Sequence, residues 1–366
     1  MTRVGLAIAA AAAVAFILVA GDGRPAAPAV EPRVAPELSP RQLAGQRIVC
    51  GFAGRQAPSG LVQAIAAGEV GGIILFSRNV ARRAQVRALT AALQDTQRPP
   101  SLRQPLIVSV DQEGGQVKRL PGPPKFSAAQ MGSRGAKVAR GQGAATGASL
   151  VDVGINVDLA PVLDVARPHG FIADQRRGFG AKPGRVSAVG VAFAQGLQSA
   201  DVAATAKHFP GLGSTAANTD LRPARIPLKA GALRRVDEAP YRAFSAAGGK
   251  LVMVSSARYP GLGAAKLPAS QSRAVVTAEL RGRIGFAGVT ISDSLEAPGA
   301  TAGAGPAKVA LRAARAGTDL LLYVHCDAAA KAAAVLANAL QAGSLDRAEF
   351  EASVDRVLAL RASLKP

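Results

Sequence analysis

Eight short apolar segments recur along the chain, and longer stretches with many polar residues separate them. Most of the eight are continuous apolar runs, which is typical of strands that are buried on both faces. They are RIVCGF (47–52), GGIILF (71–76), LIVSVD (106–111), NVDLAP (156–161), ATAKHF (204–209), LVMVSS (251–256), GVTISD (288–293) and DLLLYV (319–324).

The stretches between these segments show helical periodicity, for example in AQVRALTAALQ (84–94) and ALRAARAG (310–317). Eight strands that alternate with helices predict an α/β fold, namely a single-domain (β/α)8 barrel of the TIM type. An open, doubly wound sheet is the alternative, because both folds share this alternation.

In a barrel of this kind, functional side chains lie at the carboxyl ends of the strands. Polar residues end four of the segments: Asp111, Lys207 with His208, Ser255 with Ser256, and Asp293. A structural explanation stays open, because any strand becomes polar where it leaves the core. In that case Lys207 and His208 pair with Asp158 or Asp164 in a buried polar layer.

The composition narrows the choice of partners. The 366 residues are 49% apolar and carry a formal net charge of +20, which allows a sizeable core and a basic surface. Two explanations of the positive charge stay open. It is a by-product of an Ala- and Arg-rich composition, or it serves attachment to an anionic cell-wall polymer. Nucleic acid is not an expected partner, because the arginines are scattered and aromatic residues make up only 4% of the chain.

No metal or cofactor is expected. The histidines are His169, His208 and His325, and none has the spacing of a zinc site with a cysteine or carboxylate. The glycine-rich segments do not match the phosphate-loop pattern either.

The amino terminus predicts export. Arg3 is followed by an apolar run over 4–20, so residues 1–21 are interpreted as a signal peptide or membrane anchor. Residues 22–40 are rich in proline and alanine and are interpreted as a linker, which leaves 41–366 for the barrel. The expected location is extracellular, in the cell wall or tethered to the membrane.

Two cysteines fit the same compartment. Cys50 lies near the end of the first predicted strand and Cys326 just after the eighth. These strands are neighbours in a closed barrel, so a disulfide is geometrically feasible, and two separate buried thiols are the alternative.

Four motifs resemble glycoside hydrolase family 3, specifically its single-barrel β-N-acetylglucosaminidases. They are DQEGGQVKRL (111–120), INVDLAPVLDV (155–165), KHFPGLG (207–213) and LRGRIGFAGVTISDSLEA (280–297). The resemblance covers about 41–366. It implies retaining hydrolysis of β-linked N-acetylglucosamine in peptidoglycan fragments.

The resemblance also implies roles for individual residues. Asp293 matches the nucleophile of the family's Ser-Asp motif. The residues that match the sugar-binding set are Asp111, Arg119, Arg177, Lys207 and His208. Arg177 aligns better than Arg176 with the family's arginine before its Phe-Gly element, where the usual pattern is Asp-Arg.

The chain departs from the family in the loop after KHFPG. That loop normally ends in Asp-Ser-His, whose histidine is the general acid/base, but here it ends in Asn218, Thr219 and Asp220. Leu212 and Ser256 also stand where the family commonly has histidine. An ordinary aspartate, with a pKa near ~3.9, is protonated only about one part in a thousand at pH 7.

Three hypotheses follow from this departure. Asp220 replaces the histidine in a working glycosidase, or the acid is lost and only substrates with good leaving groups react, or the site is a glycan-binding remnant. The retained nucleophile and sugar-binding set favour an enzyme, whereas the altered pair favours a binding module.

Overall fold

The computed structural model describes residues 1–2 and 38–366, so the predicted leader and linker lie almost wholly outside the described residues. The chain from Leu38 onward belongs to one compact unit. In this described part, we find no helix with the length and apolar character needed to span a membrane.

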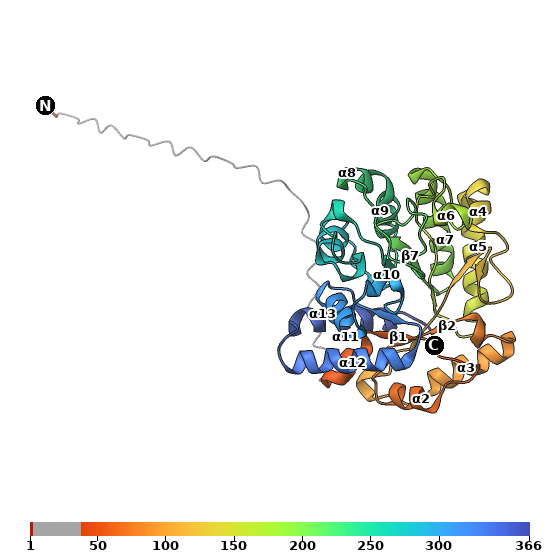
Figure 1. Ribbon diagram of the computed structural model, residues 1–366, viewed down its shortest axis with the longest axis vertical. Coiled ribbons are helices and arrows are strands. Elements are labelled where there is room, and N and C mark those ends of the chain that lie inside the picture. The colour runs from red at the N-terminus through yellow and green to blue at the C-terminus, as the bar shows by residue number, and fades with distance from the viewer. Residues whose placement is uncertain (3–37) are drawn as a thin grey trace. The chain divides into compact units, whose positions relative to one another are not determined.

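A ring of eight parallel strands forms the centre of the domain (Figure 1). The strands run in the order β10-β1-β2-β3-β6-β7-β8-β9, and a parallel bridge between Ile291 and Leu320 joins the two ends of that order. The predicted barrel is therefore confirmed, and the open sheet is wrong. The strands are β1 (Ile48–Cys50), β2 (Gly72–Leu75), β3 (Ile107–Val110), β6 (Val157–Asp158), β7 (Ala203–Phe209), β8 (Leu251–Val254), β9 (Val289–Ser292) and β10 (Leu321–Tyr323).

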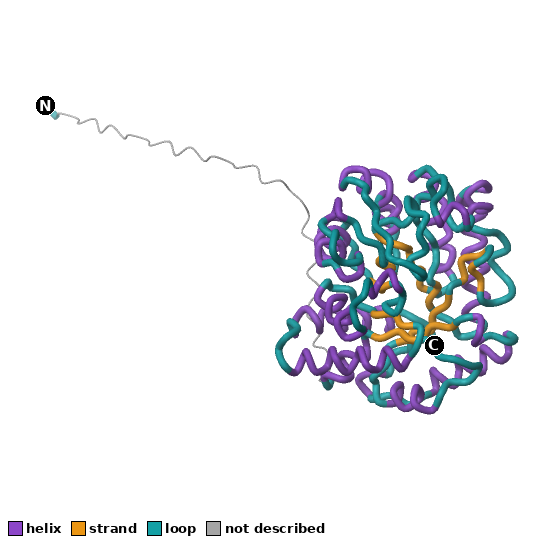
Figure 2. Tube along the Cα trace, in the orientation of Figure 1, coloured by secondary structure: helices purple, strands orange, loops and turns teal. Residues whose placement is uncertain are grey.

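Helices surround this ring (Figure 2). They are α1 (Pro40–Gln46), α2 (Ser59–Ala66), α3 (Arg83–Asp95), α4 (Ala128–Arg134), α5 (Ala136–Val151), α6 (Phe171–Asp174), α7 (Pro183–Ser199), α8 (Ala230–Ala232), α9 (Ala239–Ala246), α10 (Pro298–Thr301), α11 (Pro306–Arg315), α12 (Cys326–Gln341) and α13 (Arg347–Ala362). A hairpin of β4 (Gln112–Gly114) and β5 (Val117–Lys118) follows β3 and was not expected from the sequence.

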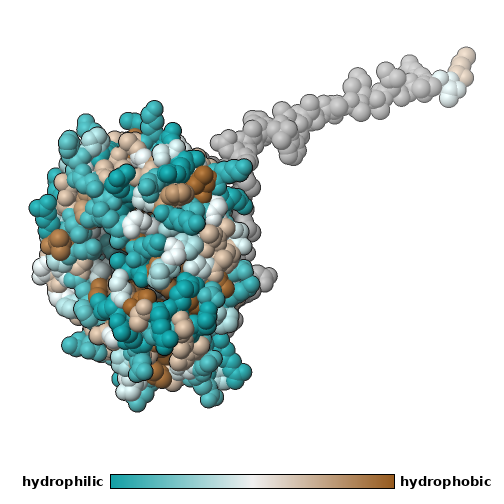
Figure 3. Space-filling view, turned by 90° about the vertical axis from the view of Figure 1, so that its right-hand side faces the viewer, coloured by the Kyte–Doolittle hydropathy of each residue, from teal (hydrophilic) through white to brown (hydrophobic). Residues whose placement is uncertain are grey.

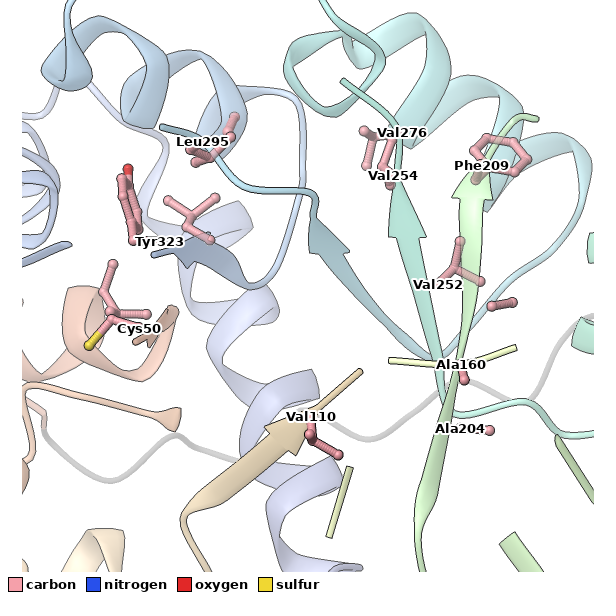
Figure 4. Close-up of a cluster of buried hydrophobic side chains, with 14 of the residues drawn as sticks. Cys50, Val110, Ala160, Ala204, Phe209, Val252, Val254, Val276, Leu295 and Tyr323 are labelled. Atoms are coloured by element: carbon pink, nitrogen blue, oxygen red, sulfur yellow. The ribbon is translucent and has the colours of Figure 1, made fainter. Parts of the chain in front are cut away.

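The alternation of side chains along each strand divides the apolar core in two. On β8, Val252 and Val254 belong to the outer cluster, whose labelled members appear in Figure 4, whereas Met253 belongs to the inner one. Two leucines of the C-terminal segment, Leu360 and Leu364, complete the inner cluster. The strands are thus covered with apolar groups on both faces, as their continuous apolar sequences require.

The two cysteines form a disulfide between Cys50 and Cys326, with Cα atoms 5.0 Å apart. Cys50 ends β1, and Cys326 begins α12 directly after β10. Since β1 pairs with β10 in the ring, the bond links the neighbouring ends of the first and last strands.

Candidate active site

A pocket of about 280 Å³ lies at the carboxyl ends of the strands. All seven residues singled out as candidates from the sequence line it: Asp111, Arg119, Arg177, Lys207, His208, Asp220 and Asp293. Ile74, Leu159, Met253 and Leu322 of the inner core also line it. The pocket therefore combines an apolar wall with convergent polar groups, which is the usual composition of a small-molecule site.

A larger hollow of about 610 Å³ lies beside α2 and α12. It is lined mainly by apolar residues and by none of the seven candidates. We assign the chemistry to the smaller pocket because titratable groups converge there.

Lys207 is the centre of a buried ionic network. Its Nζ lies 2.6 Å from Asp111 Oδ1 and 2.8 Å from Glu113 Oε1. Arg177 donates two hydrogen bonds to the same Glu113 carboxylate, at 2.8 and 2.7 Å. Arg119 is a looser member, since its Nη2 lies 3.6 Å from Asp111 Oδ2.

Glu113 and Lys207 stay ionised although both are buried. Burial opposes the ionisation of Glu113, but Lys207 and Arg177 outweigh it and lower the pKa of Glu113 to about 2. Burial alone would lower the pKa of Lys207, yet the negative charges of Asp111 and Glu113 raise it. Asp111 and Lys207 therefore present fixed opposite charges to a polar ligand in the pocket.

His208 is oriented from behind by a carboxylate. Its Nδ1 lies 2.7 Å from Asp164 Oδ2, and the other oxygen of Asp164 accepts the backbone N–H groups of His208 and Leu212, at 3.2 and 2.6 Å. The pairing of His208 with Asp164 considered from the sequence is thus present. Lys207, in contrast, pairs with Asp111 and Glu113 and not with Asp158 or Asp164.

Asp158 lies close to this network, but its pKa is shifted in the opposite direction to that of Glu113. Its Oδ1 accepts the backbone N–H of Gln112 at 2.9 Å, whereas its Oδ2 has no partner. Burial raises the pKa of Asp158 to about 8, against the hydrogen bond from Gln112 and the charge of Lys207. Asp158 is therefore mainly protonated at neutral pH and adds little charge to the pocket.

Asp293 directly follows β9 and is half-buried. One carboxylate oxygen, Oδ1, accepts the backbone N–H of Ser294 at 2.8 Å, and its own N–H donates to Val254 O at 3.1 Å. These bonds hold the residue at the strand end, where its side chain lines the pocket.

Asp220 lies on the loop that follows β7. The residue is exposed, and its backbone N–H donates to Asn218 Oδ1 at 3.0 Å. Gly299 donates its N–H to Thr219 O at 3.0 Å, which ties this loop to the segment after Asp293. Desolvation within the pocket and then the charge of Asp293 raise the pKa of Asp220 to about 6. Asp220 is therefore protonated more often at neutral pH than an ordinary aspartate.

A model of the glycosyl hydrolase family 3 N terminal domain matches residues 45–360. The chain belongs to glycoside hydrolase family 3. Within the family it is related to β-N-acetylglucosaminidases, as the solved structures below indicate.

Three similar proteins illustrate the relationship. A secreted glycosyl hydrolase of Arthroderma benhamiae, described as uncharacterized, is 38% identical over 95% of this chain and 99% of that protein. A family 3 β-N-acetylglucosaminidase from Paenibacillus sp. is 36% identical, with a TM-score of 0.82 over 89% of this chain and 63% of the other. A β-N-acetylhexosaminidase from Beutenbergia cavernae is 32% identical, with a TM-score of 0.79 over 89% of this chain and 99% of the other. The chain thus spans less than two thirds of the Paenibacillus protein.

Sequence reasoning on this family 3 chain missed Glu113, which holds both Lys207 and Arg177. It stands two positions after Asp111, inside the same DQEGG motif, but β4 was not expected there. The buried Lys207 could have indicated a second carboxylate, since a fully buried ammonium group requires pairing. Among the described residues, we find no group of three metal-ligating side chains close enough to hold a metal ion.

Proposed function

We propose that this chain is a retaining β-N-acetylhexosaminidase that cleaves terminal β-linked N-acetylglucosamine from peptidoglycan fragments. The observation that carries the proposal is the convergence of Asp293, Asp220 and the Asp111–Lys207 pair on one small pocket. The similarity to a β-N-acetylglucosaminidase and a β-N-acetylhexosaminidase supports N-acetylglucosamine as the class of sugar. Export is part of the proposal, supported by the disulfide and by the secreted relative.

In this proposal, Asp293 attacks the anomeric carbon, and the bond to the leaving oxygen breaks as that oxygen takes up a proton. Asp111, Lys207, His208, Arg119 and Arg177 hold the sugar hydroxyls or orient the groups that do. The fixed charges of Asp111 and Lys207 suit this role, because charged hydrogen bonds to hydroxyls are strong and directional.

The proton donor in the first step is Asp220. Its raised pKa of about 6 supports this role, and so does its position on the loop tied to the segment after Asp293. After the sugar is transferred to Asp293, the ionised Asp220 accepts a proton from water, which then releases the sugar. This chemistry predicts an acidic optimum, because the fraction of protonated Asp220 falls as the pH rises through 6.

A glycan-binding protein without turnover is the second candidate. The observation that favours it is the exposure of Asp220, because contact with water favours the ionised carboxylate, which has no proton to donate.

One assay separates the two candidates. The chain without residues 1–37 is offered an aryl β-N-acetylglucosaminide and an N-acetylglucosamine-containing disaccharide at pH 4–8. Hydrolysis of both, fastest below pH 6, supports the proposed glycosidase. Binding of the disaccharide without hydrolysis of either compound supports the binding protein and refutes the proposed reaction.

A further inference from the structure

The basic residues look scattered along the sequence, but the fold gathers four of them on neighbouring helices that contain no carboxylate. Helices α4, α5 and α7 contain neither aspartate nor glutamate. We define the basic helical face by the exposed side chains of Arg134, Lys137, Arg140 and Arg185. Within the described part of the chain, none of the four forms an ion pair.

Hydrogen bonds between the helices hold this face together. Arg185 on α7 donates from Nη1 to Gly132 O on α4 at 2.7 Å. Arg140 on α5 donates from Nη1 to Gln195 Oε1 on α7 at 3.0 Å. Each guanidinium is thereby positioned by one neutral acceptor, and its other N–H groups and its full charge stay available.

Between the helices runs an open groove of about 690 Å³. Lys137 and Arg140 line it together with small residues, namely Ala136, Gly184, Ser187, Ala188, Val191 and Ala192. The side of the domain that carries α4 and α5 in Figure 1 faces the viewer in Figure 3, where hydrophilic side chains cover much of the surface. The groove is open to solvent, which suits an extended chain better than a compact ligand.

The chemistry of the face selects among anionic partners. Three of its four cations are arginines, whose planar guanidinium matches phosphate oxygens in pairs. Single-stranded nucleic acid also needs aromatic platforms, and the groove has no aromatic residue in its lining. A membrane surface would favour large exposed apolar side chains, and the groove offers only alanines and one valine as apolar groups.

We propose that the basic helical face binds a polyol-phosphate polymer of the cell envelope, with phosphates on Arg134, Lys137, Arg140 and Arg185. The small residues of the groove accommodate the polyol backbone between phosphates. This inference rests on the proposed export and not on hydrolysis at the pocket, so the two can fail separately.

The test measures binding of a poly(glycerol phosphate) to the chain by calorimetry at two salt concentrations. The variant Lys137→Glu/Arg140→Glu removes two cations from the groove. The matched control, Lys308→Glu/Lys331→Glu, makes the same charge change at exposed residues of α11 and α12. Thermal unfolding of both variants checks that they fold.

We expect the groove variant to weaken binding at least about tenfold and to lower the salt dependence by about two charges, while the control binds like the parent chain. Equal weakening by both variants would overturn the proposal, because it would show a general charge effect. Absence of binding would also overturn it, as would equal or tighter binding of a carboxylate polymer, a DNA oligonucleotide or anionic vesicles.

Discussion

The two ends of the barrel each contain an aspartate held between two cations, but only one of these aspartates is exposed to a pocket. At the carboxyl ends of the strands, Asp111 meets Lys207 and Arg119 and keeps 14% of its side chain exposed to the pocket. At the opposite end, Asp319 precedes β10 and is completely buried between Arg281 and Arg356. The same residue types therefore occur in an open and in a closed network.

The closed network leaves no capacity for a ligand. Asp319 Oδ1 accepts from Nε and Nη2 of Arg356 at 3.1 and 2.8 Å. Its Oδ2 accepts from Arg281 and from the backbone N–H and hydroxyl of Thr290, the latter two at 2.8 and 2.9 Å. Every lone pair is occupied from within, so this end of the barrel serves stability, whereas the open end can bind.

The largest expected effect concerns the open end. Asp293→Asn removes the proposed nucleophile, so hydrolysis of the aryl β-N-acetylglucosaminide should fall at least ~10⁴-fold. The melting temperature should stay near that of the parent chain, because Asp293 takes part in no ion pair among the described residues. Initial rates measure the loss of hydrolysis, and thermal unfolding measures the melting temperature. Activity within tenfold of the parent would refute the assignment of Asp293.

The next effect concerns the closed end. Asp319→Asn removes a fully buried anion and leaves the partly buried Arg281 and Arg356 without it, which should lower the free energy of unfolding by about 3 kcal/mol. Chemical denaturation measures this change. The matched control, Asp95→Asn, alters an exposed residue and should change the stability by less than about 0.5 kcal/mol.

The rate per folded molecule should not change in the Asp319 variant. A variant that kept its stability but lost hydrolysis would reverse the division of roles between the two ends.

A smaller effect separates the proton donor from the nucleophile. Asp220→Asn should slow the disaccharide about 10²–10³-fold and an aryl substrate with a good leaving group much less. The pKa of about 6 gives the sign, because the protonated form is active and is lost as the pH rises through 6. The rate of the parent chain should therefore fall above pH 6. The pH–rate profile of the variant should not show this fall. An unchanged profile in Asp220→Asn would exclude this residue as the acid.

The smallest effect lies within the open network itself. Arg119 is 3.6 Å from Asp111 and partly exposed, so Arg119→Gln should weaken sugar binding by only about three- to tenfold. Arg177→Gln deprives the buried Glu113 of a bidentate partner and should cost clearly more. Both affinities are measured by calorimetry with the disaccharide. Each substitution is made in the Asp293→Asn background, which should not hydrolyse the sugar. Equal losses of sugar affinity in the two variants would show that the burial of an arginine does not determine how much it contributes to binding.

The sequence predicted the barrel because each strand is a continuous apolar run and because the periodicity changes between runs. It did not predict the β4–β5 hairpin, since this hairpin is short and contains Gly114 and Gly115 at positive φ in place of an apolar pattern. Glu113 was missed for that reason, because it lies on the unexpected strand β4, where its carboxylate meets Lys207 and Arg177.

The residues of the pocket were predictable where a motif and a strand end coincide, as at Asp111, Lys207 and Asp293. Asp319 was not, because a single aspartate before a strand resembles a turn residue until Arg281 and Arg356 are placed around it. The raised pKa of Asp220 depends first on its desolvation in the folded pocket and then on the charge of Asp293, which lies far away in the sequence.

The most direct test of the account is covalent trapping of the sugar. A fluorinated N-acetylglucosaminyl reagent that forms a slowly hydrolysed glycosyl-enzyme is added to the chain, and the labelled peptide is identified by mass spectrometry. We predict one adduct on Asp293, in the peptide that contains SDSLEA, and none in Asp293→Asn. An adduct on another residue, or persistent absence of any adduct while the substrate is hydrolysed, would contradict the account.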